Sequence, residues 1–442
     1  MSVERKYDVA IIGGGVVGAS TLYVLARYTN LGDLCLLERG SLPGSGNSSP
    51  LSNSQTLHFG DIETNYSLES ARVVDRAARL VVSYIKRNSR DCDLYRLTGK
   101  MVLAVGEQEV LELSKRRSML AGLFPKLRHL GRDELAEIEP TIVAGREKSE
   151  KISALWSPDG YAVNFQALSE SFVTDSMTSG KNVEVFLNTE AESLTASDGG
   201  YLIKTRGGSR FFARAILVAS GAYSLTFAKQ FGLGRDLAIL PVAGGFYTAK
   251  DALLNKVYRV RISGVPFAAM HGDPDVSDPS RTRFGPSAMP APYLDRWRQG
   301  SLNDFLKSDL ISFRGAAAMA RLFRENSAVR RYAMSQLGYI LPVIHKSIAL
   351  RAIRKIVPAI RKSDFYFDKS LGGVRPQVLN LKTGELLMGE AKLTGSNAIF
   401  DISPSTGAST CIDNAMKNAQ SLVGMLGEPA SFDHDLFHYE LS

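Results

Sequence analysis

A glycine-rich turn near the N-terminus is the feature that most restricts the folds open to this chain. The run YDVAII at residues 7–12 is almost continuously apolar, as in a strand that is buried on both faces. Gly13, Gly15 and Gly18 follow it in a GxGxxG pattern and begin a helix that we expect to run to about Tyr28. The run LCLLE then forms a second short strand ending at Glu38. Strand, turn, helix, strand and acid together predict a βαβ unit that binds a dinucleotide.

Each residue of this unit has a separate expected task. Gly13 permits the tight turn, Gly15 the close approach of a pyrophosphate, and Gly18 the close packing of the helix. The N–H groups and the dipole of the helix start stabilise the negative pyrophosphate. Glu38 accepts hydrogen bonds from the ribose hydroxyls, with Val17 and Arg39 beside the same ligand. These features do not distinguish NAD from FAD.

Composition narrows the class of protein. The chain has 442 residues, 44% of them hydrophobic and 22% charged, which is typical of a globular protein with two domains. The net charge of +8 is compatible with nucleic acid, anionic lipid or an acidic small substrate as a partner, but no nucleic-acid-binding motif accompanies it. Three cysteines, Cys35, Cys92 and Cys411, do not form a disulfide framework, and no metal-ligand spacing appears. The N-terminus lacks a signal-peptide pattern, so we expect a cytoplasmic protein with at most peripheral membrane contact.

The order of elements predicts an α/β fold, α+β overall, in which strands alternate with helices. We expect a discontinuous Rossmann-like dinucleotide-binding domain formed by residues 1–90, 150–235 and 370–442. Residues 91–149 and 236–369 would form an interleaved substrate-binding domain with a mixed or antiparallel sheet. Helical periodicity within the second of these segments predicts a helical insertion at about residues 300–362.

Several stretches, spread over nearly the whole chain, resemble a known family in the same order. They are SNSQTLHFGDIETNY from Ser52, PVAGGFY from Pro241, VPFAAMHGDPD from Val265, RFGPSAM from Arg283, GGVRPQVL from Gly372 and DISPSTGAST from Asp401. The resemblance is to compact bacterial malate:quinone oxidoreductases, within the glycine oxidase and L-2-hydroxyglutarate dehydrogenase class of FAD-dependent oxidoreductases. It implies non-covalent FAD, oxidation of (S)-malate to oxaloacetate by hydride transfer to flavin N5, and a quinone acceptor at the membrane.

Other functions remain open on the sequence alone. L-Lactate or L-2-hydroxyglutarate could replace malate as the substrate, since residue spacing does not measure the length of the acid. An amine or amino-acid oxidase with the same fold is the alternative activity. A third hypothesis, supported by the net charge, is a nucleic-acid-binding or assembly protein that keeps FAD only for structure.

Oxidation of a 2-hydroxy acid requires a cation for the carboxylate and a base for the hydroxyl proton. Arg375, in the GVRPQ motif, is the expected carboxylate ligand, because a guanidinium binds a carboxylate through two parallel hydrogen bonds. His271 is the favoured base, oriented by Asp273 or Asp275, while His58 is expected beside the flavin. Which of the two histidines is the base stays open. Further expected substrate contacts are Arg283, Gln55, Tyr247, Tyr66 and Gln377.

The resemblance also implies cofactor contacts outside the βαβ unit. They are Ser54, Gln55, Thr56, His58, Val185, Gly221, Ser405, Thr406, Gly407, Ala408 and Ser409. The last five begin a helix whose N-terminus would stabilise the negative charge that develops on a reduced flavin. Cys411 lies in the apolar stripe of that helix and is expected to be a buried thiol rather than a covalent flavin link.

A basic amphipathic segment occupies residues 344–362. Its isoleucines alternate with six Lys and Arg residues. One hypothesis is that this segment lies on an anionic membrane, at the inner face of the cell membrane, where a lipid-soluble quinone could be reached. The alternative is the ordinary charged face of a domain helix.

Overall fold

The N-terminal strand lies inside an eight-stranded sheet, in the computed structural model that describes residues 5–88, 94–260, 270–341, 343–387, 391–403 and 407–442. The strand order is β19-β20-β11-β1-β2-β8, and β9 and β10 extend from β11 as an antiparallel ribbon. The strands are β1 (Arg5–Ile12), β2 (Asp33–Leu37), β8 (Asn182–Phe186), β9 (Ala191–Ser197), β10 (Gly200–Thr205), β11 (Arg210–Val218), β19 (Lys392–Gly395) and β20 (Ala398–Asp401). The α/β fold class expected from the sequence is confirmed.

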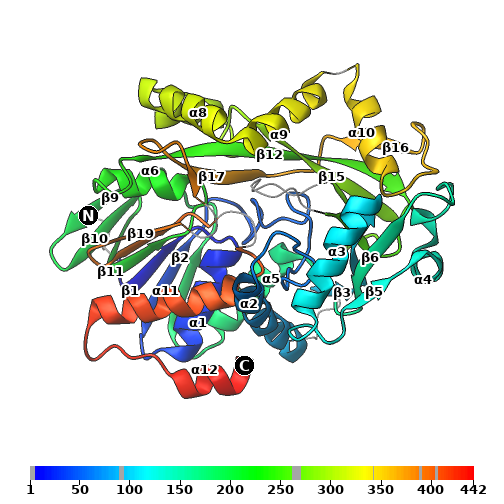
Figure 1. Cartoon of the computed structure of the whole chain (residues 1–442). Coiled ribbons are helices and arrows are strands. Elements are labelled where there is room, and N and C mark those ends of the chain that lie inside the picture. The colour runs from blue at the N-terminus through cyan, green and yellow to red at the C-terminus, as the bar shows by residue number, and fades with distance from the viewer. Residues whose placement is uncertain (1–4, 89–93, 261–269, 342, 388–390, 404–406) are drawn as a thin grey trace.

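Both faces of this sheet are covered, which explains the continuous apolar character of its central strands. Val9 and Ile11 of β1 pack under helices on one face, and Ala10 and Ile12 pack toward the β9–β10 ribbon on the other. The helices around this sheet are α1 (Val16–Tyr28), α2 (Leu68–Arg87), α5 (Phe165–Met177), α6 (Tyr223–Gln230), α11 (Cys411–Leu426) and α12 (His434–Leu441). Figure 1 shows α1, α2, α11 and α12 gathered below the sheet.

A second, ten-stranded sheet lies above the first (Figure 1). Its order is β18-β17-β12-β15-β14-β13-β4-β6-β5, with β16 also paired to β12. The strands are β4 (Lys100–Val105), β5 (Arg128–Leu130), β6 (Ile152–Ser157), β12 (Leu237–Lys250), β13 (Lys256–Arg259), β14 (His271–Pro274), β15 (Arg281–Pro290), β16 (Phe365–Asp368), β17 (Val374–Asn380) and β18 (Leu386–Leu387). A separate ribbon pairs β3 (Tyr95–Leu97) with β7 (Tyr161–Val163).

Two of these strands correct the boundaries expected from the sequence. Residues 150–235 and 370–442 were assigned to the dinucleotide-binding domain, yet β6 and β17 belong to the ten-stranded sheet. The reason is pairing that the periodicity of a single strand does not reveal, because β6 runs antiparallel to β4 and β17 runs antiparallel to the long strand β12. The dinucleotide-binding parts therefore begin again near α5 and near β19.

A layer of helices covers the outer face of the ten-stranded sheet, with α8, α9 and α10 at the top of Figure 1. The helices are α7 (Ser301–Leu306), α8 (Phe313–Glu325), α9 (Ser327–Leu337) and α10 (His345–Arg354), while α3 (Glu107–Leu120) and α4 (Arg132–Ile138) flank β6. Ile353, Ile356 and Ile360 are buried in the core beneath α10. These isoleucines are therefore not free to enter a membrane, so the part of the hypothesis for residues 344–362 that placed them in the bilayer is wrong, whereas the cations of the segment lie at the surface. No helix in the described ranges is long and apolar enough to cross a bilayer.

Candidate active site

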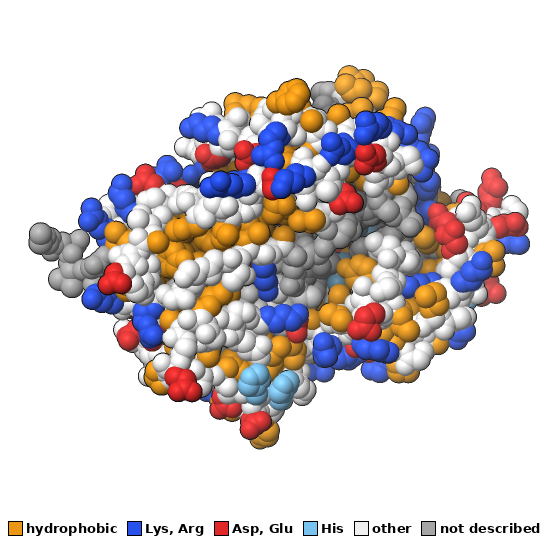
Figure 2. Space-filling model, turned by 60° about the vertical axis from the view of Figure 1, so that its left-hand side comes forward, with side chains coloured by type: hydrophobic (Ala, Val, Ile, Leu, Met, Phe, Trp, Pro, Cys, Tyr) orange, Lys and Arg blue, Asp and Glu red, His pale blue; other side chains and the backbone are white. Residues whose placement is uncertain are grey.

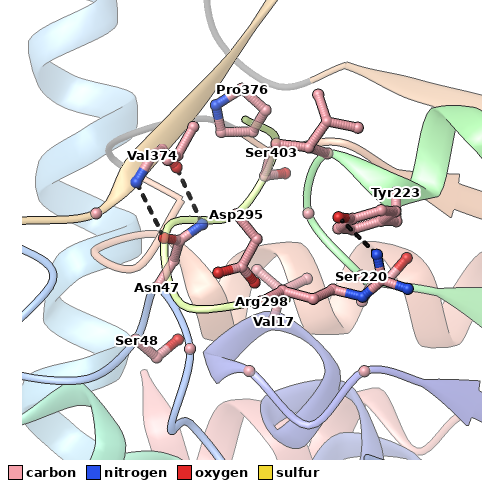
Figure 3. Close-up of a pocket in the computed structure, with 18 of the residues that line it drawn as sticks. Val17, Asn47, Ser48, Ser220, Tyr223, Asp295, Arg298, Val374, Pro376 and Ser403 are labelled. Atoms are coloured by element: carbon pink, nitrogen blue, oxygen red, sulfur yellow. Dashed lines mark hydrogen bonds between the residues drawn. The ribbon is translucent and has the colours of Figure 1, made fainter. Parts of the chain in front are cut away.

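A cleft of about 880 Å³ lies between the two sheets. Its floor is the glycine turn with the start of α1, and its other walls come from the loop at residues 44–58, the segment from Ala219 to Tyr223, and the start of β17. Gly407, Ala408 and Ser409 complete it before α11 begins. Figure 3 shows residues from these separate segments converging on one space.

The glycine turn fits a ligand that approaches the backbone. Gly13 has a φ of +108°, and a Cβ there would lie 2.5 Å from the carbonyl oxygen of Ala219. A Cβ on Gly18 would lie 1.9 Å from the carbonyl oxygen of Gly13, so Gly18 serves helix packing, and it does not line the cleft. A Cβ on Gly15 would meet only the Ser48 hydroxyl, at 3.4 Å, and would otherwise project where a ligand can lie. This division of tasks is the one that a dinucleotide site requires.

Glu38 closes the same end of the cleft. Its two carboxylate oxygens accept hydrogen bonds from the backbone N–H groups of Gly14 and Gly40, each at 2.6 Å. The side chain therefore stands directly beside the turn, where a ribose would follow a pyrophosphate bound at the start of α1.

The loop after β2 contributes residues that the motif reading did not select. The side-chain amide of Asn47 donates to the carbonyl of Val374 at 3.0 Å and accepts from its N–H at 3.3 Å, as Figure 3 shows. Ser48 accepts a hydrogen bond from the N–H of Val16, at the start of α1, at 3.0 Å. Asn47 thus joins the two sheets across the cleft. The Gly, Ser and Asn content of this loop was its only signal in the sequence.

A second set of missed residues surrounds Tyr223. Arg298 donates to the Tyr223 hydroxyl at 3.2 Å (Figure 3), and the guanidinium of Arg39 lies 5.5 Å from the centre of the same ring. Arg39 also forms an ion pair with Asp295. Asp295 and Arg298 come from the segment between β15 and α7, which had no motif that pointed to the cleft. The segment between β15 and α7 therefore forms part of the wall of the dinucleotide cleft.

His58 lines the cleft and has a buried carboxylate beside it. Its Nδ1 lies 2.5 Å from Glu63 Oε1, and the two side chains are 11% and 1% exposed. The backbone N–H of His58 donates to the hydroxyl of Ser409 at 2.9 Å, which fixes the histidine against the segment that precedes α11. This pairing orients the imidazole toward a fixed partner.

His271 lies one ring further from the cleft. It stacks on Tyr258 with ring centres 4.5 Å apart, and Tyr258 in turn lies 6.2 Å from His58. Nε2 of His271 is 3.1 Å from Asp273, which also pairs with Lys256 at 3.2 Å. Burial disfavours the charge of Asp273, but Lys256 and His271 outweigh burial and lower the pKa of this carboxyl. His271 is not among the residues that line the cleft.

Behind Gln55 stands a fully buried arginine. Arg283 donates from Nη1 to the carbonyl of Pro50 at 2.7 Å, and its Nε lies 3.4 Å from Asp275. Its Nη2 has no hydrogen-bond partner among the described residues. The guanidinium lies 5.4 Å from the ring of Phe246, which itself lines the cleft. Burial lowers the pKa of Arg283, as expected for a cation that is removed from water.

The strand register places three other expected substrate ligands elsewhere. Arg375 and Gln377 pair with Val242 and Leu240, whose side chains belong to the core under α8 and α9. The side chains of Arg375 and Gln377 therefore point toward the helical layer, although part of Arg375 still borders the cleft. Tyr247 packs in the core beneath α10, where its hydroxyl lies 2.8 Å from His345 Nδ1. Alternation along a strand decides these orientations, and a motif does not reveal its phase.

Most of the remaining residues expected to contact the cofactor line the cleft, and a few do not. Gly13, Gly15, Val17, Glu38, Arg39, Ser54, Gln55, Thr56, His58, Gly221, Gly407, Ala408 and Ser409 all line the cleft. Val185 lies in β8 and packs against the core instead. Ser405 and Thr406 fall outside the described residues. Cys411 is buried, which raises the pKa of its thiol to about 12, and no cluster of metal-ligating side chains occurs in the described part of the chain.

Fold and cleft together define a class of protein, the FAD-dependent oxidoreductases. The family model described as FAD dependent oxidoreductase matches residues 8–400. Among solved structures, glycine oxidase from Geobacillus kaustophilus superposes with a TM-score of 0.64 at 19% identity, covering 98% of each chain. The L-alpha-glycerophosphate oxidase of Mycoplasma pneumoniae, with FAD bound, gives 0.66 at 17% identity and covers 98% of this chain and 97% of that one. These two likenesses show the fold.

Curated relatives narrow the class. A probable malate:quinone oxidoreductase of Campylobacter jejuni is 36% identical over 99% of both chains, and a malate:quinone oxidoreductase of Helicobacter pylori is 34% identical over 100% of this chain and 99% of its own. The chain belongs to the malate:quinone oxidoreductase family, which confirms the resemblance and the expected FAD cofactor. An L-2-hydroxyglutarate dehydrogenase of Escherichia coli is 25% identical over 85% of this chain and 83% of its own.

Proposed function

We propose that this enzyme oxidises (S)-malate to oxaloacetate and passes the electrons to a membrane quinone. The observation that carries the proposal is the His58–Glu63 pair, in which His58 lines the dinucleotide cleft. Buried cations lie behind Gln55, another residue that lines the cleft. The names of relatives that match this chain end to end support the choice of malate and quinone.

FAD fits the cleft and, when bound, supplies the acceptor for the hydride on the carbon that bears the hydroxyl group. Gly13 and Gly15 would hold its pyrophosphate, Glu38 its ribose, and Gly407 to Ser409 the opposite end. His58 would take the hydroxyl proton of the substrate, oriented by Glu63. His58 replaces His271 in this role because it lines the cleft and His271 does not.

The charged side chains behind Gln55 have a net positive charge that would favour the binding of an organic acid. Three cations, Arg281, Arg283 and Lys256, stand beside two carboxylates, Asp273 and Asp275. One positive charge remains before an anion binds. Because a buried guanidinium N–H without a partner is costly, Nη2 of Arg283 is the group that most needs an acceptor. Arg283 is fully buried and does not itself line the cleft, so we propose it as the carboxylate ligand for an acid that passes Gln55 and Phe246, which do; Arg375, which borders the cleft, is the alternative ligand.

A panel of acids tests the proposal. Holoenzyme is mixed anaerobically with malate, L-lactate, L-2-hydroxyglutarate or glycine, and flavin absorbance is followed. Malate is expected to bleach the flavin fastest, and a quinone analogue to restore the colour. Faster bleaching by L-2-hydroxyglutarate would instead indicate an L-2-hydroxyglutarate dehydrogenase, the activity named for the Escherichia coli relative. Bleaching by glycine alone would make the protein an amine oxidase.

The quinone places the enzyme at a membrane. Quinones with long tails reside in the bilayer, so the protein would work as a peripheral protein on the inner face of the cell membrane. Fractionation of cells that express the protein tests this: recovery in the membrane pellet at low salt and release at high salt is expected. Recovery in the soluble fraction at both salt concentrations would contradict it.

A further inference from the structure

The helices α8, α9 and α10 lie over the ten-stranded sheet at the top of Figure 1, and apolar side chains are exposed on part of this helical layer. This exposed apolar surface consists of Met334 and Leu337 on α9 together with Leu341, Val343 and Ile344 before α10, and is called the apolar tip below. Val343 is 85% exposed and Met334 is 65% exposed. Aliphatic side chains gathered at the surface in this way mark a contact site for another body.

The charged residues of the chain segment that holds the apolar tip all have one sign. Residues 326–362 contain eight Lys and Arg and neither Asp nor Glu. These cations, called the basic belt below, are Arg330, Arg331, Lys346, Arg351, Arg354, Lys355, Arg361 and Lys362. None of them forms an ion pair with a described carboxylate, whereas Arg128, Lys151, Arg298 and Arg314 elsewhere in the chain do. Figure 2 shows Lys and Arg side chains next to hydrophobic ones at the top of the molecule.

We propose that the apolar tip and the basic belt dock on the surface of an anionic lipid bilayer. The aliphatic side chains would enter the boundary between headgroups and acyl chains, while the cations meet lipid phosphates. A second copy of this chain is a poor occupant, because it would bring the same eight unpaired cations against the first set. The inference deepens the proposed function, since it names the surface by which the enzyme reaches its quinone, but lipid binding can be measured without the reaction.

Flotation with vesicles provides the test. Full-length holoenzyme is centrifuged with phosphatidylcholine vesicles that contain or lack phosphatidylglycerol. One variant, Leu337→Ser with Val343→Ser, removes the apolar tip, and another, Arg351→Ser with Lys355→Ser, weakens the basic belt. Controls remove an equally exposed leucine on α3, Leu111→Ser, and an exposed arginine on β5, Arg128→Ser. Malate-dependent reduction of a water-soluble dye reports whether each variant is intact.

Wild type and both controls are expected to float only with the anionic vesicles. The basic-belt variant should partition roughly fivefold more weakly for each cation removed. The apolar-tip variant should lose flotation while dye reduction is unchanged. Equal flotation of variants and wild type, or binding that ignores phosphatidylglycerol, would overturn the proposal. So would a concentration-dependent dimer that only the tip variant abolishes. Flotation without dye reduction would instead count against the proposed reaction alone.

Discussion

At the scale of single residues, His58 is the one histidine among the described residues that line the cleft. His58→Asn should lower the rate of flavin reduction by malate roughly 10²–10⁴-fold, because the alcohol then loses its proton without a base. Glu63→Gln should give a smaller loss, since the imidazole stays but is oriented less well. Stopped-flow absorbance under anaerobic conditions measures both rates. The matched control is His271→Asn, and a larger loss there than in His58→Asn would return the role of base to His271.

Two arginines compete for the substrate carboxylate. Arg283→Lys keeps the charge but loses the fork of N–H groups, so KM for malate should rise about tenfold with a smaller change in kcat. Arg375→Lys should leave KM almost unchanged, because Arg375 points toward α9, where its charge acts on Tyr332. Steady-state kinetics with a quinone analogue separates the two. A large KM effect confined to Arg375→Lys would show that the motif predicted the ligand better than the register.

At the scale of elements, the glycine turn offers a matched pair of substitutions. Gly15→Ala adds a methyl group that meets little protein, so the chain should fold but bind FAD about tenfold to a hundredfold more weakly. Gly18→Ala should prevent α1 from packing, because its Cβ would overlap the Gly13 carbonyl. Circular dichroism reports folding and fluorescence titration reports FAD affinity. Wild-type affinity in the Gly15→Ala protein would place the pyrophosphate elsewhere.

The C-terminal helix α12 packs on the core through Phe437 and Leu441, and one carboxylate, Glu440, ties it to α1 and α2 by ion pairs. Burial disfavours the charge of Glu440, but hydrogen bonds from Arg87, Arg27 and Tyr28 outweigh it and lower its pKa to about 2. A lowered pKa stabilises the fold above the ordinary value near 4.5, and this contribution is lost as the pH falls toward 2. Because Arg27 and Arg87 are 43% and 42% exposed, solvent screens the pairs.

Glu440→Gln should therefore cost about 1–2 kcal/mol of unfolding free energy at neutral pH, and less at about pH 4. Urea denaturation of wild type and variant at both pH values measures the difference. Glu428→Gln, at an exposed position without a described ion pair, is the control. A difference that stays constant with pH would mean that the amide loses packing rather than charge.

The sequence predicted elements better than it predicted their partners. The sequence predicted that α1 ends at about Tyr28 and that α11 begins within a few residues of Ser409, because each helix has its own start signal in the chain. Pairing between distant strands leaves no local trace in the sequence, so the residue ranges expected for the dinucleotide-binding domain included β6 and β17, which pair within the ten-stranded sheet. The same limit applies to the site. Gly13, Glu38 and His58 were predicted from motifs. Asp295 and Arg298 lie in the segment between β15 and α7, which has no motif and lines the cleft only in the folded chain.

At the scale of the whole molecule, the segment between β15 and α7 joins the two halves of the enzyme across the cleft. Arg39 and Glu190 belong to the dinucleotide-binding part, and they form ion pairs with Asp295 and Arg298 of the segment before α7. Trp297 of the same segment and Lys307, which follows α7, also line the cleft. Because these residues line the cleft, we expect their ion pairs to slow the dissociation of FAD.

The double variant Asp295→Asn with Arg298→Gln breaks both cross-domain pairs and should release FAD roughly fivefold to tenfold faster, as expected from about 1 kcal/mol for a partly exposed pair. Flavin fluorescence after dilution of the holoenzyme measures the rate. High salt should accelerate release from wild type, where it screens the pairs, and have little effect on the variant. Arg128→Gln, which breaks the exposed pair with Glu134 far from the cleft, should behave as wild type. Equal release rates in the double variant and wild type would mean that the βαβ unit holds the cofactor without help from the second sheet.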